Sequence, residues 1–153
     1  MISFEEDGVW IEMEETIALH HEDVFACFTT SGGLTRWLAV AARIDLRAGG
    51  LIVLGWDEHT TRKTTIAILE YDPAGRITWD WQTQQSDTHA PLYWEVQPSL
   101  EEGAVVRLRQ GPFANNEESL IEMANEVDTW RWYLCNLRST MEVSHDMRRV
   151  RPL

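Results

Sequence analysis

The last third of the sequence carries one long amphipathic pattern, and this pattern constrains the fold more than any other feature. Apolar residues recur there at intervals of four and three positions, which places them along one stripe of a helix. The stripe comprises Met123, Val127, Trp130, Leu134, Leu137 and Met141. Asn115 and Asn116 precede it as candidate caps, and arginines between 148 and 151 follow it, where the helix dipole favours positive charge. The pattern predicts one long helix and leaves open a break near Asn125.

A run of antiparallel strands precedes this helix and offers the apolar surface that its stripe requires. Period-two alternation or a short apolar run marks five segments, which are 9–17, 51–56, 64–71, 92–98 and 104–110. The pattern also changes to period two in "AARIDLRAGG" (41–50), which ends at a glycine pair typical of a tight turn. After a turn at 72–75, the segment "RITWDW" places Ile77, Trp79 and Trp81 on one face and its polar residues on the other. Trp94 falls on the apolar face of its own strand in the same way.

Two short helical patterns follow the first strand. Apolar residues recur at helical spacing in 21–30 and again in 34–39, which contains Trp37. The glycine pair at 32–33 predicts a break between the two helices. The element order therefore predicts an α+β fold, in which a curved antiparallel sheet wraps around the long carboxy-terminal helix. We expect residues 1–153 to form a single domain of this kind.

The formal charge of −12 argues against several classes of partner. Eight acidic residues precede the first basic residue, Arg36, and no basic stripe is present that could displace counterions from nucleic acid. We therefore expect no nucleic acid partner and no membrane insertion, since no apolar run is long enough to span a bilayer. Cys27 and Cys135 fit no metal-ligand spacing, and the acidic amino end does not resemble a secretory signal. The sequence predicts a reduced, cytoplasmic protein without a metal or another cofactor.

Four segments, in this order along the chain, resemble one known family. They are "EDVFACFTTSGGLTRWLA", "RIDLRAGGLIVL", "ILEYDPAGRITWDW" and "TWRWYLCNLRSTME". Together they resemble the SRPBCC (START-like, helix-grip) superfamily. Within it they resemble the family named for homologues of the activator of the heat-shock-protein-90 ATPase. The resemblance extends over about residues 9–145 and implies a helix-grip fold. The family usually has a glycine where this chain has Thr129.

The resemblance also implies a cavity between the sheet and the last helix, which members of the superfamily often use for apolar ligands. The candidate ligand-binding residues are the large apolar side chains expected around that space. They are Trp37, Trp79, Trp81, Trp94, Met123, Val127 and Trp130. Two interpretations remain open, because aromatic residues on an inner sheet face either fill a core or line an accessible pocket. Thr129 favours a small pocket over a large one.

The sequence shows no catalytic motif. None of the five histidines shares a short metal-ligand spacing with a second ligand, apart from the adjacent pair His20 and His21. His89 is the best candidate for a general base, because it lies near the tryptophan-bearing strands and a carboxylate could orient it. No residue type in these patterns identifies a catalytic nucleophile.

Three functions therefore stay open. The leading hypothesis is a protein that binds a small apolar molecule, such as a lipid, without chemistry of its own. An enzyme of the cyclase or dehydratase kind is the first alternative, and it requires a histidine or a carboxylate that points into the cavity. A protein-interaction module is the second alternative, with a chaperone as the least favoured partner. The resemblance also leaves a homodimer open.

Overall fold

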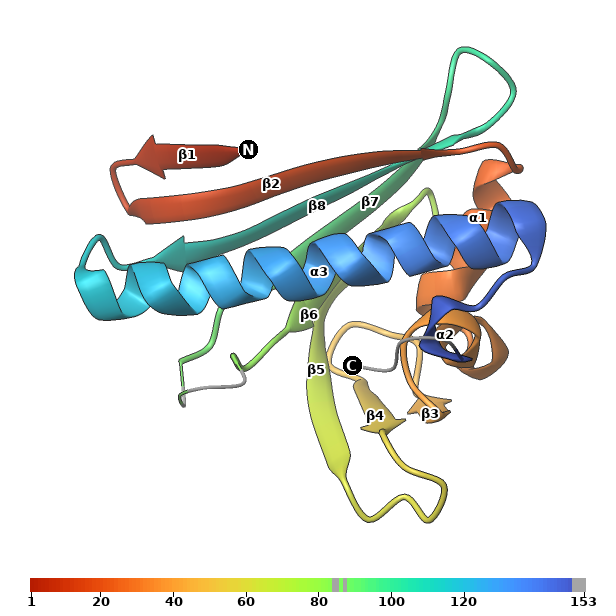
Figure 1. Ribbon diagram of the computed structural model, residues 1–153, viewed down its shortest axis with the longest axis horizontal. Helices are drawn as coiled ribbons and strands as arrows, with labels where there is room; N and C mark the ends of the chain where they lie inside the picture. Colours follow the sequence, from red (N-terminus) through yellow and green to blue (C-terminus); the bar gives the residue numbers. More distant parts are fainter. Residues whose placement is uncertain (84–85, 87, 150–153) are drawn as a thin grey trace.

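A computed structural model describes residues 1–83, 86 and 88–149, and in these residues one antiparallel sheet is the main feature (Figure 1). Its eight strands are ordered β1-β2-β8-β7-β6-β5-β4-β3. Their bounds are β1 Ile2–Glu5, β2 Gly8–Ile17, β3 Ala41–Ile44, β4 Leu51–Gly55, β5 Lys63–Asp72, β6 Arg76–Asp80, β7 Leu92–Pro98 and β8 Ala104–Phe113. The helix α3, Glu117–Val143, lies against the inner face of this sheet.

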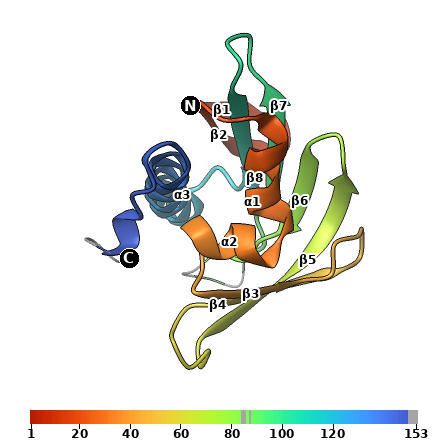
Figure 2. The ribbon, with the colours of Figure 1, turned by 90° about the vertical axis from the view of Figure 1, so that its right-hand side faces the viewer.

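The sheet is strongly twisted and curves around α3. Strands β2 and β8 run nearly along the helix, whereas β4 and β5 run across it (Figure 1). Viewed end-on, α3 sits in the hollow of the sheet, and the short helices close one end of the hollow (Figure 2). The alternation in β7 confirms the predicted inner face, because Leu92, Trp94 and Val96 are buried and Tyr93 is exposed.

The two short helices are α1, His21–Thr29, and α2, Ser31–Trp37. The break between them falls at Thr30, whose side chain accepts a hydrogen bond from the Gly33 amide at 2.9 Å and so caps α2. The predicted break at the glycine pair was therefore wrong by two residues, since both glycines belong to the first turn of α2. Gly33 is needed there, because a Cβ atom would lie 2.1 Å from the Ala26 carbonyl oxygen.

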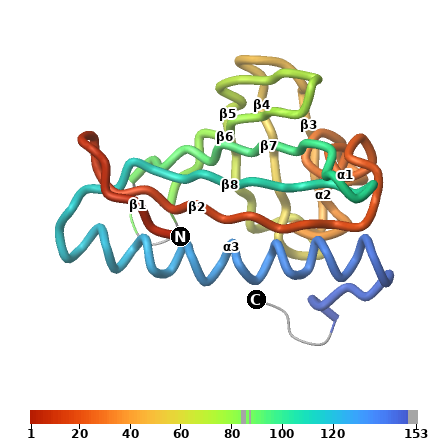
Figure 3. The backbone as a smooth tube through the Cα atoms, turned by 90° about the horizontal axis from the view of Figure 1, so that it is seen from above, coloured from red at the N-terminus to blue at the C-terminus, as the bar shows by residue number. Residues whose placement is uncertain are grey.

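Helix α3 is continuous over 27 residues, so the chain does not break near Asn125. Asn116 caps its first turn by accepting a hydrogen bond from the Ser119 amide at 2.9 Å. Ser144 ends it in the left-handed conformation. The helix covers the inner face beside β2 and β8, as the view from above shows (Figure 3).

The arginines beyond α3 do not complement its dipole as the sequence predicted. Arg148 lies in a short 3-10 helix, η1, Met147–Arg149, and its guanidinium binds the carbonyl oxygens of Thr35, Arg36 and Ala39 at 2.7–3.0 Å. Arg148 therefore caps the end of α2. Of the other two arginines, Arg149 also lies in η1 and Arg151 falls outside the described residues.

The structure confirms the predicted α+β helix-grip fold and adds one strand that the sequence analysis missed. That strand, β1, is four residues long and lies at the edge of the sheet, with only Phe4 and Ile2 as large apolar side chains, both exposed. Its exposure leaves no alternation to detect. In the part of the chain that the structure describes, no helix is both long and apolar enough to cross a lipid bilayer.

Candidate functional site

Five of the predicted site residues form one aromatic group between α3 and the sheet, which we call the indole cluster. It consists of Trp37, Trp79, Trp81, Trp94 and Trp130. All five are at most 3% exposed. Trp130 of α3 meets Trp81 and Trp94 edge to face, with ring centroids 5.0 and 5.5 Å apart. Trp94 continues the contact to Trp79 at 5.5 Å. Such edge-to-face pairs are favourable beyond the area that they bury.

The remaining predicted residues flank this cluster. Met123 is buried in the same core, and Val127 packs against it while partly exposed. Trp37 joins from α2, where its ring lies 6.1 Å from that of Trp94, and its indole N–H donates to the Cys27 carbonyl oxygen at 2.9 Å. The structure thus brings all seven predicted residues into the region between the sheet and the helices.

Leu92 marks the centre of the inner face under α3. Strand pairing places Trp79 and Gln110 on either side of it, in one row across β6, β7 and β8. Along its own strand, Ala90 and Trp94 are the neighbours whose side chains share its face. Ala90 in turn donates its amide to the Trp81 carbonyl oxygen at 2.7 Å. Trp79 and Gln110 are therefore the direct cross-strand neighbours of Leu92, and Trp81 pairs with the chain just before β7.

Two buried polar residues stand in this apolar setting, and sequence analysis missed both. Glu126 of α3 is 4% exposed and Gln110 of β8 is fully buried. One carboxylate oxygen of Glu126 accepts hydrogen bonds from the Trp130 indole N–H at 2.9 Å and from the Gln110 amide nitrogen at 3.3 Å. The Gln110 nitrogen also reaches the Ala90 carbonyl oxygen at 3.4 Å. We call Gln110, Glu126 and Trp130 the interior polar cluster.

A signal for the interior polar cluster exists in the sequence. Gln110 continues the alternation of Val106 and Leu108, and Glu126 precedes Trp130 by one helical turn. Each is a polar residue in phase with an apolar face. Such residues are hydrogen-bonded when buried, and they often serve a site.

Four buried polar atoms in the same region have no hydrogen-bond partner among the described residues. They are the indole nitrogens of Trp79, Trp81 and Trp94 and the side-chain oxygen of Gln110. Buried indole N–H groups normally find an acceptor. Leaving such a group unpaired costs about 1–3 kcal/mol.

His89 has the carboxylate partner that the sequence analysis required, but not in the interior. Its Nδ1 lies 3.0 Å from an Asp80 carboxylate oxygen, and its side chain is 57% exposed. Asp80 belongs to the strand face opposite Trp79 and Trp81. The pair therefore sits on the outside of the sheet, and the interior carboxyl group is that of Glu126.

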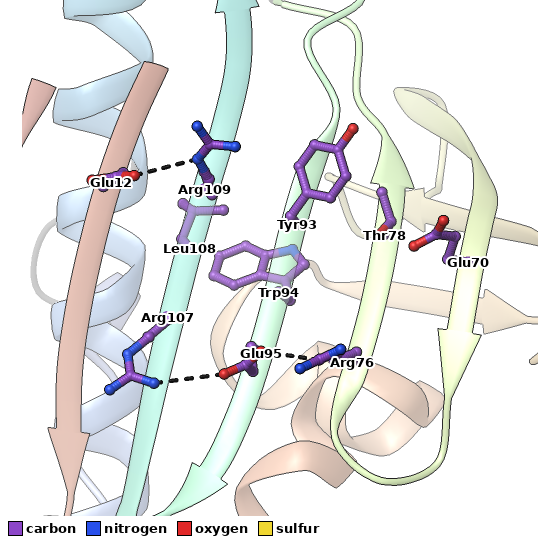
Figure 4. A pocket seen from close by; sticks show the side chains of 10 residues that line it. All are labelled: Glu12, Glu70, Arg76, Thr78, Tyr93, Trp94, Glu95, Arg107, Leu108 and Arg109. Carbon is purple, nitrogen blue, oxygen red and sulfur yellow. Dashed lines mark hydrogen bonds and ion pairs between the residues drawn. The ribbon is translucent and has the colours of Figure 1, made fainter. Parts of the chain in front are cut away.

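The outer face of the sheet carries a separate pocket of about 400 Å³ (Figure 4). Its lining is mostly charged and comprises Glu12, Glu70, Arg76, Thr78, Tyr93, Trp94, Glu95, Arg107, Leu108 and Arg109. Glu95 lies between two arginines, 3.0 Å from Arg76 and 3.5 Å from Arg107. A hydrogen bond from Arg107 to the Glu14 carboxylate raises the pKa of its guanidinium. These arginines are therefore already paired with protein carboxylates.

Other groups of chemical interest within residues 1–83, 86 and 88–149 are the possible metal ligands and the buried side chains of Cys27 and Tyr133. No group of three or more His, Cys, Asp or Glu side chains there could hold a metal ion. Burial raises the pKa of the Cys27 thiol from 9.0 to about 11, which keeps it protonated and unreactive. Burial also raises the pKa of Tyr133.

A curved antiparallel sheet that wraps around one long helix defines the helix-grip class of proteins. The family model described as "Activator of Hsp90 ATPase homolog 1-like protein" matches residues 18–142, and the chain belongs to that family. The resemblance inferred from the sequence is thereby confirmed. No curated protein matches this chain.

Several solved structures share the fold at low sequence identity. Protein SSP2350 from Staphylococcus saprophyticus is 18% identical with a TM-score of 0.77, over 91% of this chain and 96% of that one. The Aha1 dimer from Colwellia psychrerythraea is 16% identical with a TM-score of 0.71, over 88% and 96%. DynU16, described as a putative protein in the dynemicin biosynthetic locus, is 12% identical with a TM-score of 0.71, over 93% of this chain and 49% of that one. These similarities show the fold alone.

Proposed function

We propose that this protein binds a small apolar molecule between α3 and the inner face of the sheet. The ligand would contact the residues that the sequence singled out. They are Trp37, Trp79, Trp81, Trp94, Met123, Val127 and Trp130. The observation that carries the proposal is the set of four buried polar atoms, three in the indole cluster and one on Gln110, that lack a hydrogen-bond partner among the described residues. A core selected for stability alone would not retain them, because each costs free energy when buried unpaired.

Calorimetric titration with apolar aromatic probes, together with intrinsic tryptophan fluorescence, tests this proposal. Val127→Phe should fill space beside the indole cluster and weaken binding by about tenfold. Val143→Phe is the matched control, because it makes the same change on the same helix at a position that is 70% exposed. If no probe releases heat or alters the fluorescence, the proposal fails.

A second candidate function is an enzyme of the cyclase or dehydratase kind that uses the same interior. Glu126 favours it, because a buried carboxyl group beside a bound ligand can move a proton. The test is to incubate each ligand that binds with the protein and to follow loss of water or ring closure by mass spectrometry. Glu126→Gln should retain binding and abolish conversion. A ligand recovered unchanged from the unmodified protein would exclude this candidate for that ligand.

Other partners rest on weaker support. We propose the cytoplasm as the compartment, since both cysteines are free thiols. The Colwellia relative forms a dimer, and that supports testing this chain for a homodimer by light scattering. A chaperone remains the least favoured partner. Co-purification that disappears at high salt would indicate only attraction by the acidic surface.

A further inference from the structure

Resting on the proposed function, the geometry points to a more specific ligand, and we propose its chemical class. The ligand is a planar, conjugated molecule that carries a carbonyl oxygen and a hydroxyl group. Its carbonyl accepts a hydrogen bond from at least one of the indole N–H groups of Trp79, Trp81 and Trp94, and its hydroxyl donates to Gln110.

The donors come from the sheet. The indole nitrogens of Trp79, Trp81 and Trp94 are donors only, and each is buried without an acceptor among the described residues. By contrast, the indole N–H groups of Trp37 and Trp130 are each satisfied at 2.9 Å by protein oxygens. Among the described residues, the unpaired donors of the indole cluster therefore belong to the three indoles carried by the sheet and the residue after β6. A hydrogen-bond acceptor on the ligand is the group that they require.

The single unpaired acceptor has a fixed orientation. The Gln110 amide nitrogen faces two acceptors, the Glu126 carboxylate oxygen at 3.3 Å and the Ala90 carbonyl oxygen at 3.4 Å. Turning the amide over would place its oxygen against both of these oxygens, so the assignment of the two amide atoms is determined by the contacts. The Gln110 oxygen is therefore left as an acceptor, and a ligand hydroxyl is its complement.

Strand register places the residues that carry these groups near one another on the inner face of the sheet. Trp79, Leu92 and Gln110 lie in one row across three adjacent strands, which are about 4.8 Å apart. Trp94 follows Leu92 on the same face, and Trp130 packs across Trp81 and Trp94 from α3. Flat aromatic surfaces in edge-to-face arrangement favour a planar ligand over a flexible chain.

Charge excludes the other common class of apolar ligand. A fatty acid would bring its carboxylate into a region that already contains the carboxyl group of Glu126. Among the described residues, no lysine or arginine is buried to neutralise it. Burying an uncompensated carboxylate is strongly unfavourable. The ligand polarity is therefore that of a neutral hydroxyketone.

Three tricyclic probes of the same skeleton test the proposal by calorimetry on the full chain. They are fluorene, which has no polar atom, fluorenone, which adds the carbonyl, and hydroxyfluorenone, which adds both groups. Each correctly placed hydrogen bond should tighten binding by about threefold to tenfold, so the order is fluorene, fluorenone, hydroxyfluorenone from weakest to tightest. Palmitate should bind more weakly than fluorenone.

Single-residue variants show which side chain causes each increase in affinity along the probe series. Trp79→Phe, Trp81→Phe and Trp94→Phe each remove one unpaired N–H and keep a ring, and at least one should abolish the advantage of fluorenone over fluorene. Trp56→Phe is the control, because its N–H already donates to Thr64 at 2.8 Å on a different part of the sheet. Gln110→Met should abolish only the advantage of hydroxyfluorenone.

The outcomes separate this inference from the proposed function. If fluorene binds as tightly as the two ketones, or if palmitate binds more tightly than fluorenone, the inference is overturned while interior binding stands. If none of the four probes binds, both are overturned. The probe series on the unmodified protein decides the matter even if Gln110→Met does not fold.

Discussion

The two faces of the sheet differ in whether their polar side-chain groups have partners within the protein. On the outer face, Arg76 and Arg107 pair with Glu95 and Arg109 pairs with Glu12, as Figure 4 shows around the outer-face pocket. On the inner face, the indole N–H groups of Trp79, Trp81 and Trp94 are buried and have no hydrogen-bond partner among the residues that the structure describes. The arginines of the outer face are paired with glutamates of the same face, whereas these three indole N–H groups of the inner face have no acceptor among the described residues.

The difference teaches where specificity resides. Exposed ion pairs exchange readily with water and contribute little to stability or selection. A buried donor that lacks a protein partner favours a ligand that supplies an acceptor over one that does not, because only the former adds a hydrogen bond. The charged outer face is therefore the weaker candidate for a selective binding site. The aromatic inner face, although it resembles an ordinary hydrophobic core, is the stronger candidate. Four experiments test or refine this comparison.

The largest expected effect is that of Trp130→Ala on the inner face. Trp130 is fully buried at the centre of the indole cluster, so its truncation should lower the free energy of unfolding by about 3–5 kcal/mol in urea denaturation. Tyr93→Ala is the outer-face counterpart, since Tyr93 is 40% exposed, and it should cost about 1 kcal/mol or less. Equal losses for the two variants would remove the energetic distinction between the faces.

The next effect concerns the buried thiol of Cys27. Its pKa is raised by burial to about 11, above the value of 9.0 expected in the unfolded chain. The stability that it contributes is complete below pH 9 and is lost as the pH rises towards 11, at up to roughly 1.4 kcal/mol per pH unit. Urea denaturation from pH 8 to pH 11 should therefore show a shallower decline for Cys27→Ala.

Cys135→Ala serves as the control for this titration, because Cys135 is exposed and its removal should leave the decline unchanged. Tyr133 also has a raised pKa, so part of the decline remains in every variant. A Cys27→Ala protein that loses stability as steeply as the unmodified one contradicts the assignment.

A smaller effect separates paired from unpaired indoles. Trp37→Phe removes an N–H that donates to the Cys27 carbonyl oxygen, whereas Trp94→Phe removes an N–H without a partner in the described part of the chain. The two rings are about equally buried, so Trp37→Phe should be less stable than Trp94→Phe by about 1 kcal/mol. Chemical denaturation measures the difference. The opposite order would mean that the Trp94 N–H is satisfied after all.

The smallest effect is expected from the outer face. Arg107→Ala removes ion pairs with Glu14 and Glu95, yet all three side chains are substantially exposed. The loss of unfolding free energy should be the smallest of the four and should shrink further at high salt. A double-mutant cycle between Arg107 and Glu14 measures the pair directly. A coupling as large as the loss caused by Trp130→Ala would show that the ion pairs of the outer face matter as much as the packing of the inner face.

The sequence predicted most of the fold because its patterns are local and regular. Alternation in β6 and β7 placed Trp79, Trp81 and Trp94 on the inner face, and the apolar stripe predicted α3. Strand β1 escaped because an exposed edge strand of four residues carries no alternation. Arg148 was misassigned because its partners, three carbonyl oxygens at the end of α2, are distant in the sequence.

The site was predictable only in its apolar part. Large apolar residues are usually buried, so the tryptophans of the indole cluster could be predicted from the sequence. Gln110 and Glu126 were passed over because single polar residues within an apolar face are usually assigned to the surface. Their meeting depends on the register of β8 against α3, which no local pattern encodes. The unpaired indole nitrogens likewise follow only from three-dimensional packing.

The clamp formed by Arg148 has a mechanical consequence. Beyond residue 130, α3 is fastened to the molecule by Arg138 to Glu15, by Asn136 to the Trp37 carbonyl, and by the arginine that grips α2 just past the helix end. Because only residues 114–116 connect its other end to β8, the helix is tethered to the rest of the molecule at both ends. Contacts outside the indole cluster therefore fix the position of α3 over the inner face of the sheet.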